Sequence, residues 1–136
     1  MRRPPTDREI QRRIHKKYYE NFGKFDREKP EPERSSKIYV PIDCEAIAKD
    51  LGVDPDIVFG RLYYHLDKKY GYINPDGSRV HLFAFAVGKD RHAVNFPLLS
   101  AVLAESEESW FRFTAPFIVS GFALLVSILA SSCRSA

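Results

Sequence analysis

The longest uncharged segment of the chain lies near its C-terminus and limits what the chain can fold into. Residues 113–130 read FTAPFIVSGFALLVSILA, 18 residues without a charged side chain. About 20 helical residues cover the roughly 30 Å of hydrocarbon in a bilayer. A chain of 136 residues has little core in which to bury such a helix, and no charged face suits it to a membrane surface. We therefore expect a transmembrane helix over residues 110–131 and a short tail over residues 132–136.

The residues that flank this segment fit a membrane boundary. Trp110 and Arg112 stand at its start, and Arg134 follows its end. Amphipathic rings and long cationic side chains are favoured at the membrane interface, so we expect these three residues there. No apolar signal region follows the basic N-terminus, which predicts that the N-terminal part stays in the cytosol. The predicted protein is a single-pass membrane protein that contacts lipid through residues 110–131, a topology that resembles tail-anchored proteins.

Charge is distributed unevenly along the chain. Residues 1–36 carry eleven Lys and Arg against seven Asp and Glu, whereas residues 37–96 carry eight of each. The basic character therefore belongs to the N-terminal segment. A DNA-binding domain normally carries a positive surface, which the neutral segment 37–96 does not supply.

Residues 1–24 are predicted to form a basic amphipathic helix. Thr6-Asp7-Arg8-Glu9 has the pattern of a capping box. Apolar residues follow at a spacing of four: Ile10, Ile14, Tyr18 and Phe22. Basic residues occupy the other faces: Arg8, Arg12, Arg13, Lys16 and Lys17. This basic surface is either a solvated face or a contact for anionic lipid or nucleic acid. Residues 25–36 are charged, contain proline and predict a linker.

Residues 37–96 predict a small α+β domain. The β-branched and aromatic residues 37–42 indicate a short strand, which Pro41 would place at a sheet edge. Asp43 is a predicted N-cap for a helix over residues 44–51, which Gly52 ends. Asp54 caps the next helix, which runs to about Lys69. Its inner stripe is Val58, Leu62 and Leu66.

The order of helix, short strand, helix, helix and hairpin, with the turn sequence I-A-x-x-L-G-V at residues 47–53, resembles a winged helix-turn-helix domain. The resemblance covers roughly residues 6–96. It implies DNA contacts from the helix after the turn, for which the candidates are Arg61, His65, Lys68 and Lys69. Asp54 and Asp56 at the start of that helix oppose phosphate binding.

The predicted hairpin is unusually apolar for a solvent-exposed wing. We expect one strand over residues 80–87, a turn over Gly88–Arg91 and a return strand over residues 92–96. This turn sets Val87 opposite His92, Phe85 opposite Val94 and Phe83 opposite Phe96. We expect the hairpin to be covered by its own helices or by a partner. A connecting helix over residues 97–109 then leads into the transmembrane helix.

No catalytic motif is present. The sequence lacks a glycine-rich phosphate loop, HExxH, CxxC and GxSxG, and its two cysteines, Cys44 and Cys133, form no zinc or disulfide pattern. We expect no enzyme activity, no cofactor and no metal. The leading hypothesis is a membrane-anchored module for protein–protein assembly or regulation, with a protein partner or homo-oligomer. The alternatives are a membrane-tethered DNA-binding regulator, for which charge is unfavourable, and an anionic-lipid-binding module.

Overall fold

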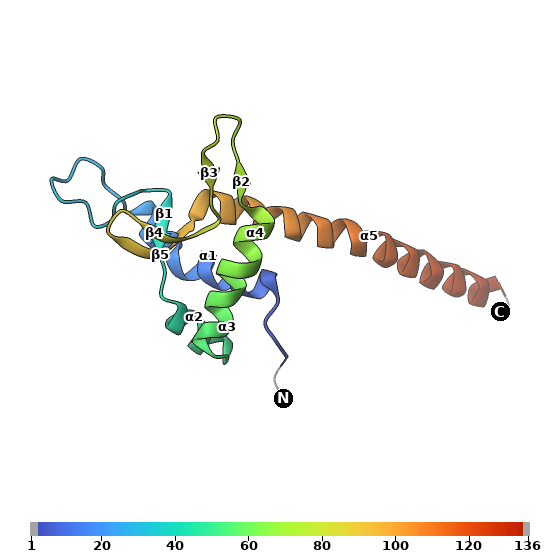
Figure 1. Ribbon diagram of the computed structural model, residues 1–136. Coiled ribbons are helices and arrows are strands. Elements are labelled where there is room, and N and C mark those ends of the chain that lie inside the picture. The colour runs from blue at the N-terminus through green and yellow to red at the C-terminus, as the bar shows by residue number, and fades with distance from the viewer. Residues whose placement is uncertain (1–2, 135–136) are drawn as a thin grey trace. The chain divides into compact units, whose positions relative to one another are not determined.

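The computed structural model describes residues 3–134 and has helices, two small antiparallel sheets and a long C-terminal helix (Figure 1). The chain divides into two units, one through Leu103 and one from Ala104 onward. The elements are α1 (Asp7–Gly23), β1 (Tyr39–Pro41), α2 (Cys44–Leu51), α3 (Pro55–Gly60), the π-helical turn η1 (Arg61–Leu66), α4 (Asp67–Tyr70), β2 (Tyr72–Ile73), β3 (Arg79–Val80), β4 (Phe83–Val87), β5 (Asp90–Asn95) and α5 (Phe96–Arg134).

The helices of the first unit begin where local capping signals predict. The Thr6 hydroxyl accepts a hydrogen bond from the Glu9 backbone N–H, and the Glu9 carboxylate accepts one from the Thr6 N–H. Asp43 and Asp54 accept backbone N–H bonds at the starts of α2 and α3. Gly52 adopts the left-handed conformation, with φ 67°, and ends α2. These caps satisfy N–H groups that the helices leave unpaired.

The helix predicted from Asp54 to about Lys69 is present, but it is not a uniform α-helix. It runs through α3, η1 and α4, with a π-helical turn at Arg61–Leu66. The predicted inner stripe of Val58, Leu62 and Leu66 is fully buried. π-Helical turns inside α-helices occur frequently at functional sites. Here the turn carries the exposed side chains Tyr63 and Tyr64.

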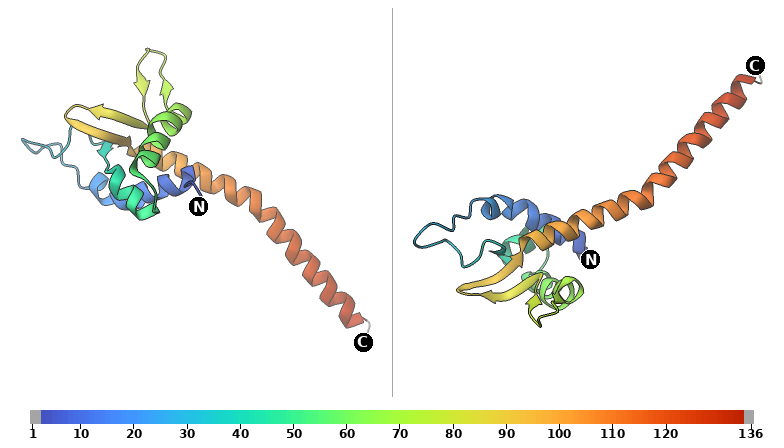
Figure 2. Two further views of the ribbon diagram at one scale, coloured as in Figure 1. Left: turned by 60° about the horizontal axis from the view of Figure 1, so that its bottom comes forward. Right: turned by 90° about the horizontal axis from the view of Figure 1, so that it is seen from above.

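The larger sheet has the strand order β1-β5-β4, with both pairs antiparallel. β1 is an edge strand, as Pro41 predicts. β2 and β3 form a separate two-stranded hairpin, which lies apart from the larger sheet (Figure 2). Its turn at Asn74–Ser78 places Gly77 at φ 87°.

Two details of the predicted hairpin are wrong. Residues 80–87 do not form one strand, because the chain leaves β3 after Val80 and enters β4 at Phe83. The register is also displaced by two residues, since Phe83 pairs with Val94 and Val87 with Asp90. The turn therefore has two residues rather than four. A displacement of two keeps every side chain on its predicted face, because strand side chains alternate with a period of two.

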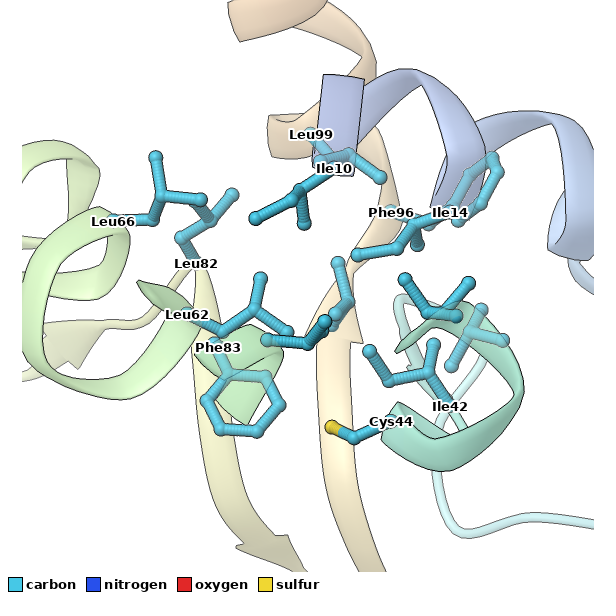
Figure 3. Packing of buried hydrophobic residues seen from close by; sticks show 14 of the residues in the cluster. Ile10, Ile14, Ile42, Cys44, Leu62, Leu66, Leu82, Phe83, Phe96 and Leu99 are labelled. Carbon is cyan, nitrogen blue, oxygen red and sulfur yellow. The ribbon is translucent and has the colours of Figure 1, made fainter. Parts of the chain in front are cut away.

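The core of the first unit joins residues that are distant in sequence (Figure 3). Side chains from α1, α2, the α3–η1–α4 helix, the larger sheet and the start of α5 meet there. Phe96 is buried and stacks on Phe22 at 4.9 Å and on His15 at 5.2 Å between ring centroids. Leu99, Val102 and Leu103 of α5 are also buried. The base of the hairpin is buried within the chain, and Phe85 near its turn is exposed.

The predicted linker over residues 25–36 has no helix or strand, but Arg34 fixes it to the domain. The buried guanidinium of Arg34 donates to the carbonyl oxygens of Asn21, Ser36 and Lys37 at 2.9, 2.8 and 3.0 Å. It also lies 4.7 Å from the centre of the Phe25 ring. Burial lowers the pKa of Arg34. One arginine thus caps carbonyls at the end of α1 and orders the segment that follows.

The second unit consists of α5 from Ala104 onward. Within residues 3–134, α5 is the one helix long and apolar enough to cross a membrane, with a mean hydropathy of 2.1 over its best 18-residue window. None of that window is buried. The helix includes Pro116 and continues to Arg134, so residues 132–134 of the predicted tail are helical. Residues 135 and 136 lie outside the described part of the chain.

Candidate functional site

A groove of about 600 Å³ lies beside β4 in the first unit. We call it the β4 groove. Its lining comprises Tyr63, Tyr64, Asp67 and Lys68 of the helix α3–η1–α4, Arg79, His81 and residues 83–86 of β4. We call α3–η1–α4 the long helix of the first unit. β4 is the outer strand of its sheet, and no strand among residues 3–134 pairs with its other edge. The groove therefore follows an edge of β4 that has no partner strand, and the Phe83 N–H donates to Asp67 there.

Asp67 of α4 connects the helix side of the β4 groove to the start of β4 by hydrogen bonds. Its Oδ1 accepts the backbone N–H groups of Leu82 at 2.9 Å and Phe83 at 3.3 Å. Its Oδ2 lies 3.0 Å from His81 Nδ1 and 3.8 Å from a guanidinium nitrogen of Arg79. Because the carboxylate is buried, these contacts supply the hydrogen bonds that a buried charge requires. They also explain why the predicted strand over residues 80–87 is interrupted at Leu82.

Aromatic side chains form a continuous layer beside the β4 groove. Phe59 stacks on Tyr63 at 5.4 Å and meets Phe83 edge-on at 5.8 Å. Tyr63 meets Tyr64 edge-on at 5.0 Å. Phe85 lies 5.4 Å from the His92 ring. These contacts leave large apolar surface in water, since Tyr63, Tyr64 and Phe85 are 42, 71 and 46% exposed.

The four predicted nucleic-acid contacts have different neighbours in the structure. Arg61 and His65 both face Asp7 at the start of α1, with Arg61 Nε 2.5 Å and His65 Nε2 3.1 Å from its carboxylate oxygens. Lys68 lines the β4 groove. The Lys69 ammonium lies 5.1 Å from the centre of the Tyr70 ring. The positive charge of Arg61 is thus neutralised within the domain.

The predicted lipid contacts lie on α1. Arg12, Lys16 and Lys17 are exposed, whereas Arg8 and Arg13 are half-buried. Lys17 pairs with Asp50 at 3.1 Å. The basic face is therefore only in part available to an anionic surface.

The predicted membrane-interface residues all lie on α5. Trp110 is exposed, and Arg112 pairs with Glu108 one helical turn earlier. Arg134 is the last residue of the helix. Hydroxyl groups of Thr114 and Ser127 donate to backbone carbonyls of the same helix, at 3.0 Å each, which reduces the polarity that this helix exposes.

The chemistry of the remaining polar groups is limited. Among the described residues, no group of three or more His, Cys, Asp or Glu side chains is arranged to hold a metal. Cys44 is buried, and burial raises the pKa of its thiol to about 11. A thiol with a raised pKa is a poor nucleophile at neutral pH.

Sequence reasoning did not single out Asp67, Tyr63 or Arg79 as parts of a site. Asp67 follows the buried Leu66 directly, yet an acid beside an apolar stripe is common on helices and gives no specific signal.

Comparisons with protein-family models, with curated proteins and with solved structures returned no match for this chain.

Proposed function

We propose that this chain is a non-catalytic, single-pass membrane protein whose winged-helix-like domain serves protein–protein assembly or regulation at the cytosolic face. The carrying observation is the exposed apolar helix α5, joined in one chain to a folded domain with an open groove. An exposed 18-residue segment of mean hydropathy 2.1 is costly in water and favourable in hydrocarbon. A lipid bilayer is thus the environment that suits it.

The order of elements supports the winged-helix-like part of the proposal. A helix, an edge strand, two helices and a hairpin follow one another, and the edge strand pairs with the second strand of the hairpin. The additional β2–β3 hairpin lies between α4 and β4 in chain order. It is an insertion relative to the simple order of elements that the sequence predicts.

The surface of the helix α3–η1–α4 favours protein binding over DNA binding. Its N-terminus carries Asp54 and Asp56, and Arg61 is paired with Asp7. Phosphate binding depends on available cations, of which few remain here. The exposed tyrosines and Phe85 suit a protein contact, where aromatic residues are enriched.

The membrane part is tested with the full chain expressed in cells. We expect the protein to stay with the membrane pellet after alkaline carbonate washing. Replacing Leu124 and Leu125 by Arg should release it, since each centrally placed Arg costs roughly 2.5–3.5 kcal/mol on insertion scales. The control is Trp110→Arg, at the predicted interface, which should stay bound. Release of the unaltered protein by carbonate would refute the anchor.

Topology is tested with the native cysteines. Cys133 is exposed near the end of α5, and Cys44 is buried in the other unit. In sealed membrane vesicles with the first unit outside, as its digestion by added protease shows, Cys133 should react with a membrane-impermeant maleimide only after detergent is added, and a Cys133→Ser variant should stay unlabelled. Labelling of Cys133 without detergent would refute the proposed orientation.

The assembly part is tested by cross-linking and purification of the full chain in detergent, beside titration with random duplex DNA. A stoichiometric protein complex, or a defined oligomer in sedimentation, is the expected result. Micromolar DNA binding that weakens steeply with salt, and that Lys68→Ala and Lys69→Ala reduce, would replace this proposal by the DNA-binding alternative.

A further inference from the structure

The shape of the β4 groove indicates what kind of molecule it accepts. Four consecutive residues of β4, 83–86, line it. Consecutive strand residues point to opposite faces, so a groove that touches all four runs along the edge of the strand rather than over one face. An edge strand presents unpaired backbone N–H and C=O groups, with which another extended chain can pair. We infer from this that an added strand is the natural occupant.

The side chains around the free edge provide selectivity. Tyr63 and Tyr64 stand on the helix side, and Phe85 stands on the strand itself. All three keep at least two fifths of their surface exposed. An added strand would place alternate side chains against these rings, and aromatic anchors commonly dominate the energy of such contacts.

The charges at the β4 groove indicate an acidic occupant. Lys68 and Arg79 are exposed and line the groove, with His81 beside them. Asp67 is the acid among the lining residues, and its oxygens accept two backbone N–H groups, contact His81 and lie 3.8 Å from a guanidinium nitrogen of Arg79. Arg91 lies 5.5 Å from the centre of the Phe85 ring and adds a cation nearby. The cations Lys68 and Arg79 outnumber the one acid of the lining, so the groove keeps a positive charge, which an acidic side chain complements.

We propose that the β4 groove binds an extended segment of a partner protein, which pairs with the free edge of β4 and sets an acidic side chain against Lys68 and Arg79. This inference rests on the proposed function and names its partner class. A nucleic acid would use the same cations and rings but cannot continue the hydrogen-bond ladder of the sheet. A second copy of the chain would offer the same edge, but it brings cations rather than acids from its own groove.

The test uses the full chain in lipid nanodiscs and a displayed library of random 12-residue peptides, with empty nanodiscs for counter-selection. Selected peptides should alternate apolar and polar residues and carry at least one Asp or Glu. The double variant Lys68→Glu, Arg79→Glu should bind the best peptide at least about tenfold more weakly. The matched control is Lys69→Glu, which neighbours Lys68 on the same helix but does not line the groove. It should leave the affinity within about threefold of the unaltered chain, as expected for a charge outside the contact.

The strand-pairing part has its own test. Two versions of the best peptide carry N-methyl groups on alternate residues, one version on the odd and one on the even positions. A strand that adds to β4 uses the N–H groups of only one set, so one version should lose binding and the other should keep it. Equal effects of both versions would overturn the strand-pairing proposal.

The remaining outcomes also decide the question. Failure to select any peptide, peptides without acids, or equal binding to the double variant would overturn the inference. Tight binding of a 12-residue oligonucleotide in place of peptides, or dimerisation that occupies the groove, would do the same. None of these results affects the membrane pellet, the Cys133 labelling or complexes that form through another face, so failure of the groove is separable from failure of the proposed function.

Discussion

Removing the Asp67 carboxylate should destabilise the first unit far more than removing an exposed acid. In Asp67→Ala, the buried N–H groups of Leu82 and Phe83 lose their acceptor. An unsatisfied buried donor costs about 1–3 kcal/mol, and the 3.3 Å bond to Phe83 belongs at the lower end of that range. We expect the free energy of unfolding to fall by about 2–4 kcal/mol, since the adjacent groove admits some water.

Two further variants identify the physical cause. Both backbone N–H groups donate to Oδ1, whereas Oδ2 faces His81 and Arg79. Asp67→Asn can therefore keep both backbone bonds and lose only the charge, which should cost about 1 kcal/mol. Asp50→Ala removes an exposed pair with Lys17 and should cost about 0–1 kcal/mol.

The assay is guanidinium chloride unfolding of the full chain in detergent micelles, followed by tyrosine near-ultraviolet circular dichroism. All 7 tyrosines precede Leu103, and a Trp110→Phe background removes the overlapping indole signal, so the signal reports the first unit and not the rest of α5. A loss for Asp67→Ala no larger than that for Asp50→Ala would refute the role given to these hydrogen bonds. A loss for Asp67→Asn equal to that for Asp67→Ala would show that charge, rather than the backbone bonds, is decisive.

Three other predictions concern single groups. Backbone and side-chain hydrogen bonds from Thr6, with Arg3, lower the pKa of Glu9 from 4.5 to about 2. Its stabilising effect on α1 is therefore complete above pH 4.5 and is lost as the pH falls toward 2. Glu9→Gln should remove that part of the acid dependence of helicity, measured by circular dichroism. Gly71→Ala should destabilise the first unit by roughly 1–3 kcal/mol in the same unfolding assay, because a Cβ would lie 2.5 Å from the Asp67 carbonyl oxygen; an unchanged midpoint would contradict this packing. Cys44, whose pKa burial raises to about 11, should react with a thiol reagent at pH 8 only after unfolding. Cys44→Ser provides the control, and fast labelling of native Cys44 would contradict its burial.

Features that depend on neighbouring residues could be predicted from the sequence. The caps at Thr6, Asp43 and Asp54 act within three residues, so the pattern alone locates three helix starts. The stripe of Val58, Leu62 and Leu66 likewise follows from helical periodicity. The apolar helix near the C-terminus follows from composition.

Features that depend on tertiary contacts could not be predicted. The hairpin register follows from a two-residue turn, and several turn lengths are compatible with Gly88-Lys89-Asp90-Arg91. The break between β3 and β4 follows from Asp67, which lies 15 residues before Leu82. The β4 groove combines residues from the helix α3–η1–α4, from β3 and from β4, and no local sequence pattern predicts that they lie together.

The same carboxylate that stabilises the first unit also lines the β4 groove. Asp67 accepts the N–H groups of Leu82 and Phe83, and the chain changes sheets between Val80 and Phe83. A substitution at Asp67 therefore alters stability and the groove together. Lys68 is the residue at which binding can be changed separately, because it is exposed and lies outside the core, whereas Arg79 also pairs with Asp67.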